Sequence, residues 1–134
     1  MPVTYVIDSS KKVIRTTCSA PLQFEEVIHH FRELKEDPAC TGRLDVLLHV
    51  SDIDLIPKGD QLMAVSAEVR ALRKKVQFGA CGIVAARDAI FGMMRVFEVL
   101  SGEYFGAIRV FRESAEAERW LASQQQPEDS GQKR

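Results

Sequence analysis

The segment from Gln77 to Arg112 constrains the fold more than any other part of the chain, because it carries the patterns of a strand, a helix and a second strand. Residues 78–86 are continuously apolar and bounded by charge, as in a strand buried on both faces of a parallel sheet. A helix is predicted from Asp88, a reasonable N-cap, to Leu100, with Gly102 just past its end. The alternation from Phe105 to Phe111 predicts the next strand.

Periodicity in the rest of the chain predicts a single α/β domain over residues 1–123. Crossovers between parallel strands are right-handed, so helices that join neighbouring strands fall on one face of the sheet. The polar segment 124–134 has no pattern and is predicted to be a disordered tail. The other predicted elements are a hairpin of Thr4–Ile7 and Val13–Cys18, a helix opened by Ser19–Pro21 and ended by Asp37-Pro38, a strand over Arg43–Val50, a helix from Gly59 to about Lys75, and a last helix from Ser114.

The strand over residues 43–50 indicates how the two faces of the sheet differ. Leu44, Val46, Leu48 and Val50 alternate onto one face and supply a helix-covered core. Asp45, Leu47 and His49 point to the other face. Because that face is mostly polar here, we expect it to be thinly covered, with Asp45 and His49 solvated.

Composition excludes several classes of protein. A net charge of −1 over 134 residues gives no reason to expect nucleic acid or an anionic membrane surface as a partner. No apolar run approaches the ~20 residues of a membrane span, and the N-terminus lacks a secretory signal. The three cysteines are odd in number and widely spaced, which suits a reducing cytoplasm. Cys18 and Cys81 are predicted to be buried free thiols, and Cys40, in a turn, to be the most reactive.

The sequence offers no catalytic, metal or cofactor motif. His29 and His30 are adjacent on a helix and diverge by about 100°, so they cannot chelate one metal together. The chain has no Gly-x-Ser-x-Gly elbow, and Gly79 and Gly82 lie inside a strand without the Lys-Ser/Thr of a phosphate loop. We therefore predict no catalytic residues, no metal ligands and no cofactor.

Several segments together resemble a family of small bacterial STAS-like (SpoIIAA-like) proteins. They are Ala85–Asp88, Phe91–Arg95, and Val110–Ala115 followed by Trp120-Leu121, and the resemblance extends to about Ala122. It implies a β/α superhelix with one mixed sheet, an N-terminal antiparallel hairpin followed by parallel strands, and helices mainly on one face. Better-known STAS domains are binding modules, some of them switched by a phosphoserine after the third strand. The comparable stretch here, Leu55–Asp60, has no serine, so no such switch is expected.

Two apolar residues fall on the polar, outward-facing sides of predicted helices, where a polar residue is expected. On the helix from Asp88, Phe91 falls on the polar side beside Arg95 and Glu98. On the preceding helix, Met63 falls between basic residues. The predicted core arc of the helix from Asp88 consists of Ile90, Met93, Met94, Val96, Phe97 and Leu100.

These observations favour a non-catalytic interaction or regulatory module that self-associates as a homodimer or binds a regulatory protein. Phe91, Arg95 and Glu98 are its predicted contact residues, since an aromatic ring with a charged rim is typical of interfaces. The alternative is a carrier or sensor of a small apolar, lipid-like ligand. That ligand would bind between the helices around Met63, Phe91 and Met94.

Overall fold

The structure is a computed structural model of the chain, and it describes residues 2–125. These residues form five strands and four α-helices in the predicted order. Their bounds are β1 Val3–Asp8, β2 Val13–Ser19, α1 Phe24–Glu36, β3 Gly42–Asp52, α2 Gly59–Leu72, β4 Val76–Val84, α3 Asp88–Ser101, a single 3₁₀ turn η1 Gly102–Tyr104, β5 Ala107–Phe111 and α4 Ser114–Gln125.

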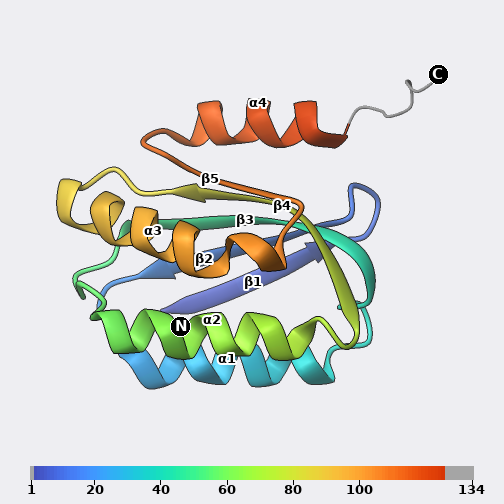
Figure 1. Ribbon diagram of the computed structural model, residues 1–134, viewed down its shortest axis with the longest axis horizontal. Helices are drawn as coiled ribbons and strands as arrows, with labels where there is room; N and C mark the ends of the chain where they lie inside the picture. The colour runs from blue at the N-terminus through green and yellow to red at the C-terminus, as the bar shows by residue number, and fades with distance from the viewer. Residues whose placement is uncertain (1, 126–134) are drawn as a thin grey trace.

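The five strands form one mixed sheet in the order β1-β2-β3-β4-β5. β1 and β2 are antiparallel, and each later strand is parallel to its neighbour, so the predicted α/β class is confirmed. Helices α1, α2 and α3 cover one face of the sheet, and α4 lies alone on the other (Figure 1). Each parallel pair is joined by one crossover helix, which explains why three helices share a face.

The expectation of a thinly covered second face is wrong where α4 lies, although Val6 of β1 remains 65% exposed on that face. Leu47 is fully buried there, in a cluster with Ala117 and Leu121 of α4. Trp120 of α4 packs over Gly82, where a Cβ would lie 3.7 Å from the indole ring. Polar residues on one side of β3 are not by themselves a sign of exposure. The sequence did not indicate that the last helix packs on this face of the sheet.

Asp45, predicted to be solvated, is completely buried on this α4 side. Its Oδ1 accepts a hydrogen bond of 2.8 Å from the Ala80 N–H, and its Oδ2 accepts one of 2.7 Å from the Gln125 amide. The β3–β4 register shifts at Asp45, so the side chain serves a backbone donor beside the irregularity. A Cβ at Gly79 would overlap Asp45 Oδ1, and this explains the glycine at that position.

Several predicted boundaries move because of local hydrogen bonding. α1 begins at Phe24 rather than near Pro21, since Gln23 is its N-cap and its backbone N–H donates a hydrogen bond of 3.0 Å to Oε1 of Glu26. Arg87, not Asp88, is the N-cap of α3. Helix α2 ends at Leu72, and the residues up to Lys75 form turns. Helix α4 continues through Gln125, and the remainder of the predicted tail, 126–134, lies outside the described residues.

All three cysteines are buried, and Cys40 is not the exposed thiol that its turn predicted. Cys40 has no exposed surface, because the turn folds its side chain into the core beneath α1 and α2. Burial raises the pKa of all three thiols, that of Cys18 to about 11. The prediction of buried thiols at Cys18 and Cys81 is confirmed.

None of the helices between residues 2 and 125 combines the length and the apolar character needed to cross a bilayer.

Candidate functional site

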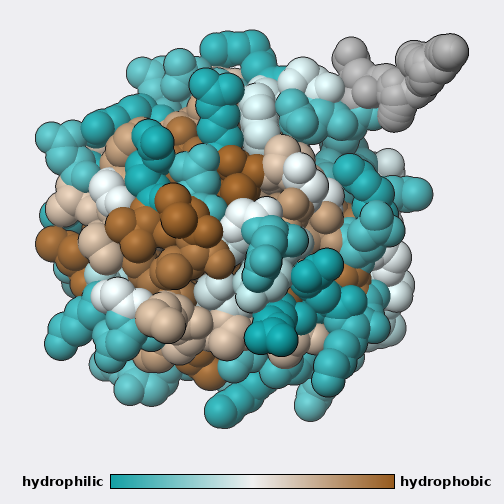
Figure 2. Space-filling view, in the orientation of Figure 1, coloured by the Kyte–Doolittle hydropathy of each residue, from teal (hydrophilic) through white to brown (hydrophobic). Residues whose placement is uncertain are grey.

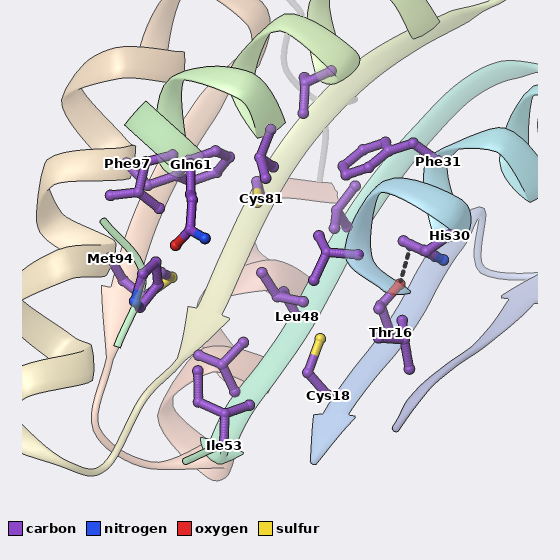
Figure 3. Close-up of a pocket in the computed structure, with 18 of the residues that line it drawn as sticks. Thr16, Cys18, His30, Phe31, Leu48, Ile53, Gln61, Cys81, Met94 and Phe97 are labelled. Atoms are coloured by element: carbon purple, nitrogen blue, oxygen red, sulfur yellow. Dashed lines mark hydrogen bonds between the residues drawn. The ribbon is translucent and has the colours of Figure 1, made fainter. Parts of the chain in front are cut away.

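A cavity of about 140 Å³ lies between the sheet and the helices α1, α2 and α3 (Figure 3). Its floor comes from β2, β3 and β4, with Ile14, Leu48 and Cys81 among its residues. Natural protein interiors contain few voids larger than a water molecule. A cavity of this size is therefore the feature of the fold that most needs an explanation.

The cavity residues of each helix recur at helical spacing, so they lie on one side of that helix. On α1, Phe24, Val27, Phe31 and Leu34 follow one another at intervals of three or four residues and face the sheet. On α2, the cavity residues are Gln61, Leu62, Val65, Val69 and Leu72, again on one side. From α3, Met94 and Phe97 complete the wall.

The half-buried part of the lining lies near the carboxyl ends of β2 and β3. Leu22 follows β2, and Leu55 and Pro57 follow β3. The segment after β3 is held by Arg87, whose Nη1 donates a bond of 2.6 Å to the carbonyl oxygen of Ile53.

The lining contains three side chains with nitrogen or oxygen, and two of them are deep. Thr16 and His30 expose only 4% and 7% of their surfaces. Thr16 Oγ1 lies 3.5 Å from His30 Nε2, and His30 Nδ1 has no partner within the described part of the protein. Gln61 is half-buried, and its Oε1 accepts a 3.0 Å bond from the Lys58 N–H.

Burial sets the charge of this histidine. Loss of hydration lowers the pKa of His30 from 6.5 to about 4, so the imidazole is neutral at pH 7. The ring packs between two aromatic neighbours: the Tyr5 ring centroid lies 5.2 Å away in an edge-on arrangement, and the Phe31 centroid lies 5.5 Å away. The cavity is thus uncharged, with polar side chains at Thr16 and His30 in its depth and at Gln61 in its half-buried part.

Its volume decides what the cavity can hold. An engineered protein cavity of about 150 Å³ binds benzene, so a single ring of that size fits here. Without an occupant, a cavity of 140 Å³ costs about 3 kcal/mol at ~24 cal/mol per Å³. This cost is a large fraction of the 5–15 kcal/mol typical of domain stability.

The residues predicted for the site lie in different places in the structure, some in the cavity wall and some on the surface. Met94 is buried and lines the cavity, whereas Met63 is 62% exposed on the far side of α2. Phe91 is half-buried and packs against the core, with the Arg112 guanidinium 4.1 Å from its ring centroid. Arg95 and Glu98 form an ion pair of 3.0 Å on the surface. Of Met63, Phe91 and Met94, the cavity includes only Met94.

The exposed apolar surface of α3 differs from the predicted one. Val96 was expected in the core but is 43% exposed, and Val99 is 83% exposed. Figure 2 shows an apolar patch where α3 lies in Figure 1. The buried residues of α3 are Ile90, Met94, Phe97 and Ser101, at spacings of four, three and four, so its core arc is narrower than the sequence suggested.

His49, also predicted to be solvated, is half-buried, and its Nε2 lies 3.0 Å from Ser114 Oγ at the start of α4. This pair joins β3 to α4 and lies outside the cavity. In the described residues no carboxylate hydrogen-bonds to His49, so the pair lacks the orienting acid of a catalytic triad. Nor do residues 2–125 bring together three or more His, Cys, Asp or Glu side chains in a geometry that could hold a metal ion.

The sequence predicted an apolar site between the helices around Met63, Phe91 and Met94, but not a cavity at this position or the burial of His30. A signal for His30 was present: it follows Val27 by three residues and precedes Leu34 by four, which places it on the apolar face of α1. No comparable signal exists for the cavity, because its volume depends on how far α1 and α2 stand from the sheet.

Comparison of the sequence with known protein families gave no matching family, and comparison with curated proteins gave no significant match.

Proposed function

We propose that the protein is a non-catalytic binding domain of STAS-like type that holds a small apolar molecule in the cavity between α1, α2, α3 and the sheet. The observation that carries this proposal is the cavity itself. A volume of 140 Å³ lined almost wholly by apolar side chains matches a preformed small-molecule site better than a packing defect.

Energetics supports the same conclusion. The cavity carries a cost of about 3 kcal/mol, which a Val-to-Phe or Val-to-Leu change in its wall could recover. A bound molecule recovers part of this cost as well, and it stabilises the folded state by an amount that rises with the logarithm of its concentration over Kd. The element order and the mixed sheet are those that a STAS-like domain has, and such domains bind rather than catalyse.

The proposal is tested with toluene as the probe, by following backbone amide shifts in NMR. Wild-type protein is expected to show saturable shifts in α1 and α2 and an increase in Tm. Val65 lies in the wall and is half-buried, so Val65→Phe should fill the space and abolish binding. Met63→Phe places the same ring on the exposed side of the same helix and should leave binding unchanged.

Native mass spectrometry of the purified protein provides a second readout, because it reports any retained small molecule together with the number of subunits. If toluene causes no saturable shift in wild-type protein, or if Val65→Phe binds it as well as wild type, the cavity is not a binding site and the proposal is wrong.

The exposed side of α3 supports a second candidate function, self-association of two copies. Val96 and Val99 expose apolar surface there, and Arg95 and Glu98 occupy adjoining positions with opposite charges. A two-fold interface presents the same patch from both copies, so Arg95 of one copy can pair with Glu98 of the other. This arrangement retains Phe91, Arg95 and Glu98 as interface residues at the edge of the Val96–Val99 patch.

Sedimentation velocity tests this second candidate. Val99→Lys should convert a dimer into a monomer, whereas Ala122→Lys, on the exposed side of α4, should not. A wild-type protein that remains monomeric at concentrations of about 100 μM would overturn the self-association proposal and leave the cavity proposal intact.

A further inference from the structure

We propose that the ligand of the cavity is a neutral, single-ring molecule of the phenol class, whose hydroxyl group hydrogen-bonds to the Thr16–His30 pair. This inference rests on the proposed function and adds to it the chemical class of the ligand. Three properties of the cavity lead to it: its volume, the absence of charge from its wall, and the incomplete hydrogen bonding of His30.

Volume limits the ligand to about one ring. At 140 Å³ the cavity is close to the ~150 Å³ that accommodates benzene, so a six-membered ring with one or two small substituents fits. A ring also suits the wall better than a flexible chain does. Phe24, Phe31 and Phe97 supply flat surfaces around the space, and a rigid ligand loses little conformational entropy on binding.

Charge limits the ligand to a neutral molecule. Among the described residues that line the cavity there is no Asp, Glu, Lys or Arg. The only titratable groups in the wall with a shifted pKa are His30, Cys18 and Cys81, and burial favours the neutral form of each. A carboxylate or phosphate buried here would have no counter-charge, and such burial is too costly to be compensated by one ring.

Hydrogen bonding then selects a hydroxyl group. The 3.5 Å separation of Thr16 Oγ1 and His30 Nε2 is at the limit of a hydrogen bond, so both atoms keep capacity for a closer partner. His30 Nδ1 has no partner within the described chain. A neutral imidazole has one donor and one acceptor nitrogen, and a hydroxyl group can pair with either. A hydroxyl beside Thr16 can therefore bond to Nε2 whichever nitrogen carries the proton.

The test compares three probes of similar size by calorimetric or NMR titration at pH 7.5: p-cresol, toluene and benzoate. Toluene has the ring and methyl group of p-cresol without the hydroxyl, and benzoate carries a charge. Wild-type protein should bind p-cresol about 3–10-fold more tightly than toluene, the gain of one net hydrogen bond. Benzoate should bind at least tenfold more weakly than either.

Variants assign the preference to the named residues. In His30→Phe, the ligand hydroxyl keeps only Thr16 as a partner, so the preference for p-cresol should be lost and toluene should bind at least as tightly as p-cresol. Thr16→Val, which keeps the shape of the side chain, should shift the ratio in the same direction and serves if His30→Phe does not fold. His29→Phe, at the adjacent exposed position, should leave the preference of wild type unchanged.

The outcomes separate the two proposals. If toluene binds as tightly as p-cresol to wild-type protein, or if His30→Phe and Thr16→Val both keep the preference for p-cresol, the phenol class is wrong and the cavity proposal stands. If benzoate binds best, the requirement for a neutral ligand is wrong. If none of the three probes binds, both proposals fail.

Discussion

The buried histidine should make the stability of the protein depend on pH in a predictable way. In the folded state burial holds the pKa of His30 at about 4, and in the unfolded chain the value returns to 6.5. Between these values the unfolded chain binds more protons than the folded protein does. Stability therefore rises with pH through this window and falls as the solution is acidified.

The magnitude follows from the two values. At pH 8 both states carry a neutral imidazole and the contribution of His30 is close to zero. Protonation of the unfolded state lowers the free energy of unfolding by about 1 kcal/mol at pH 6 and about 2 kcal/mol at pH 5. The loss approaches its limit of about 3 kcal/mol near pH 4.

Neighbouring groups do not obscure this window. Of the residues in ring contact with His30, Tyr5 is titratable, and its pKa is raised to about 12 by burial and by a hydrogen bond of 2.7 Å to Asp37. Tyr5 is thus neutral from pH 5 to pH 8. The thiol of Cys18, also in the cavity wall, is neutral there as well because burial raises its pKa to about 11.

Urea denaturation at pH 8, 7, 6 and 5 and constant ionic strength measures the effect. Wild-type protein should lose about 2 kcal/mol between pH 8 and pH 5, and His30→Phe should lose much less. His29→Gln removes an exposed histidine and should behave as wild type. NMR titration of the His30 ring gives the folded pKa directly. Equal losses in wild type and His30→Phe, or a folded pKa near 6.5, would refute the reasoning.

Three further predictions concern single positions. Gly79→Ala should destabilise the protein by about 2 kcal/mol in urea denaturation, because the added Cβ overlaps Asp45. Gly92→Ala, whose Cβ would have no atom within 4 Å, should stabilise the protein by about 0.5–1 kcal/mol. Similar effects of the two substitutions would contradict this account. All three native thiols should react slowly with iodoacetamide, and rapid modification of Cys40 would show that its turn opens. Phe91→Ala should lower the free energy of unfolding by about 2 kcal/mol, since the half-buried ring contacts the core and Arg112. An unchanged Tm together with the loss of self-association would instead make Phe91 an interface residue without a role in stability.

The sequence was sufficient for the order of elements because each element carries its own period. Local geometry and burial alone determine two of these patterns, and both appear in the structure as predicted. They are the apolar run of β4 and the alternation of Leu44, Val46, Leu48 and Val50 in β3. Caps were less predictable, because Gln23 and Arg87 are not favoured N-cap residues. At Gln23 a reciprocal hydrogen bond compensates, and only the folded geometry reveals it.

Residues at the interfaces between layers were the least predictable. Asp45 carries no sequence sign of burial, because its partners, Ala80 and Gln125, lie 35 and 80 residues away. Val96 falls on the apolar side of a helical wheel, yet it is exposed in the structure. The residues of α3 that are buried cover a narrower arc of the helix than the apolar residues do. Long-range contacts decide such cases, and local periodicity contains no information about them.

The two faces of the sheet differ in a way that bears on function. On the α4 side, Leu47 and Ala117 have no exposed surface, and the buried carboxylate of Asp45 is hydrogen-bonded at both oxygens. Beneath α4 this face is closely packed, and the buried carboxylate has its hydrogen-bond partners. On the other side the same sheet borders a cavity of about 140 Å³, and the one buried side-chain nitrogen without a partner among the described residues, Nδ1 of His30, belongs to a residue of its wall. The close packing beneath α4 contrasts with the space on the other face, and this contrast supports the proposal of a binding site there.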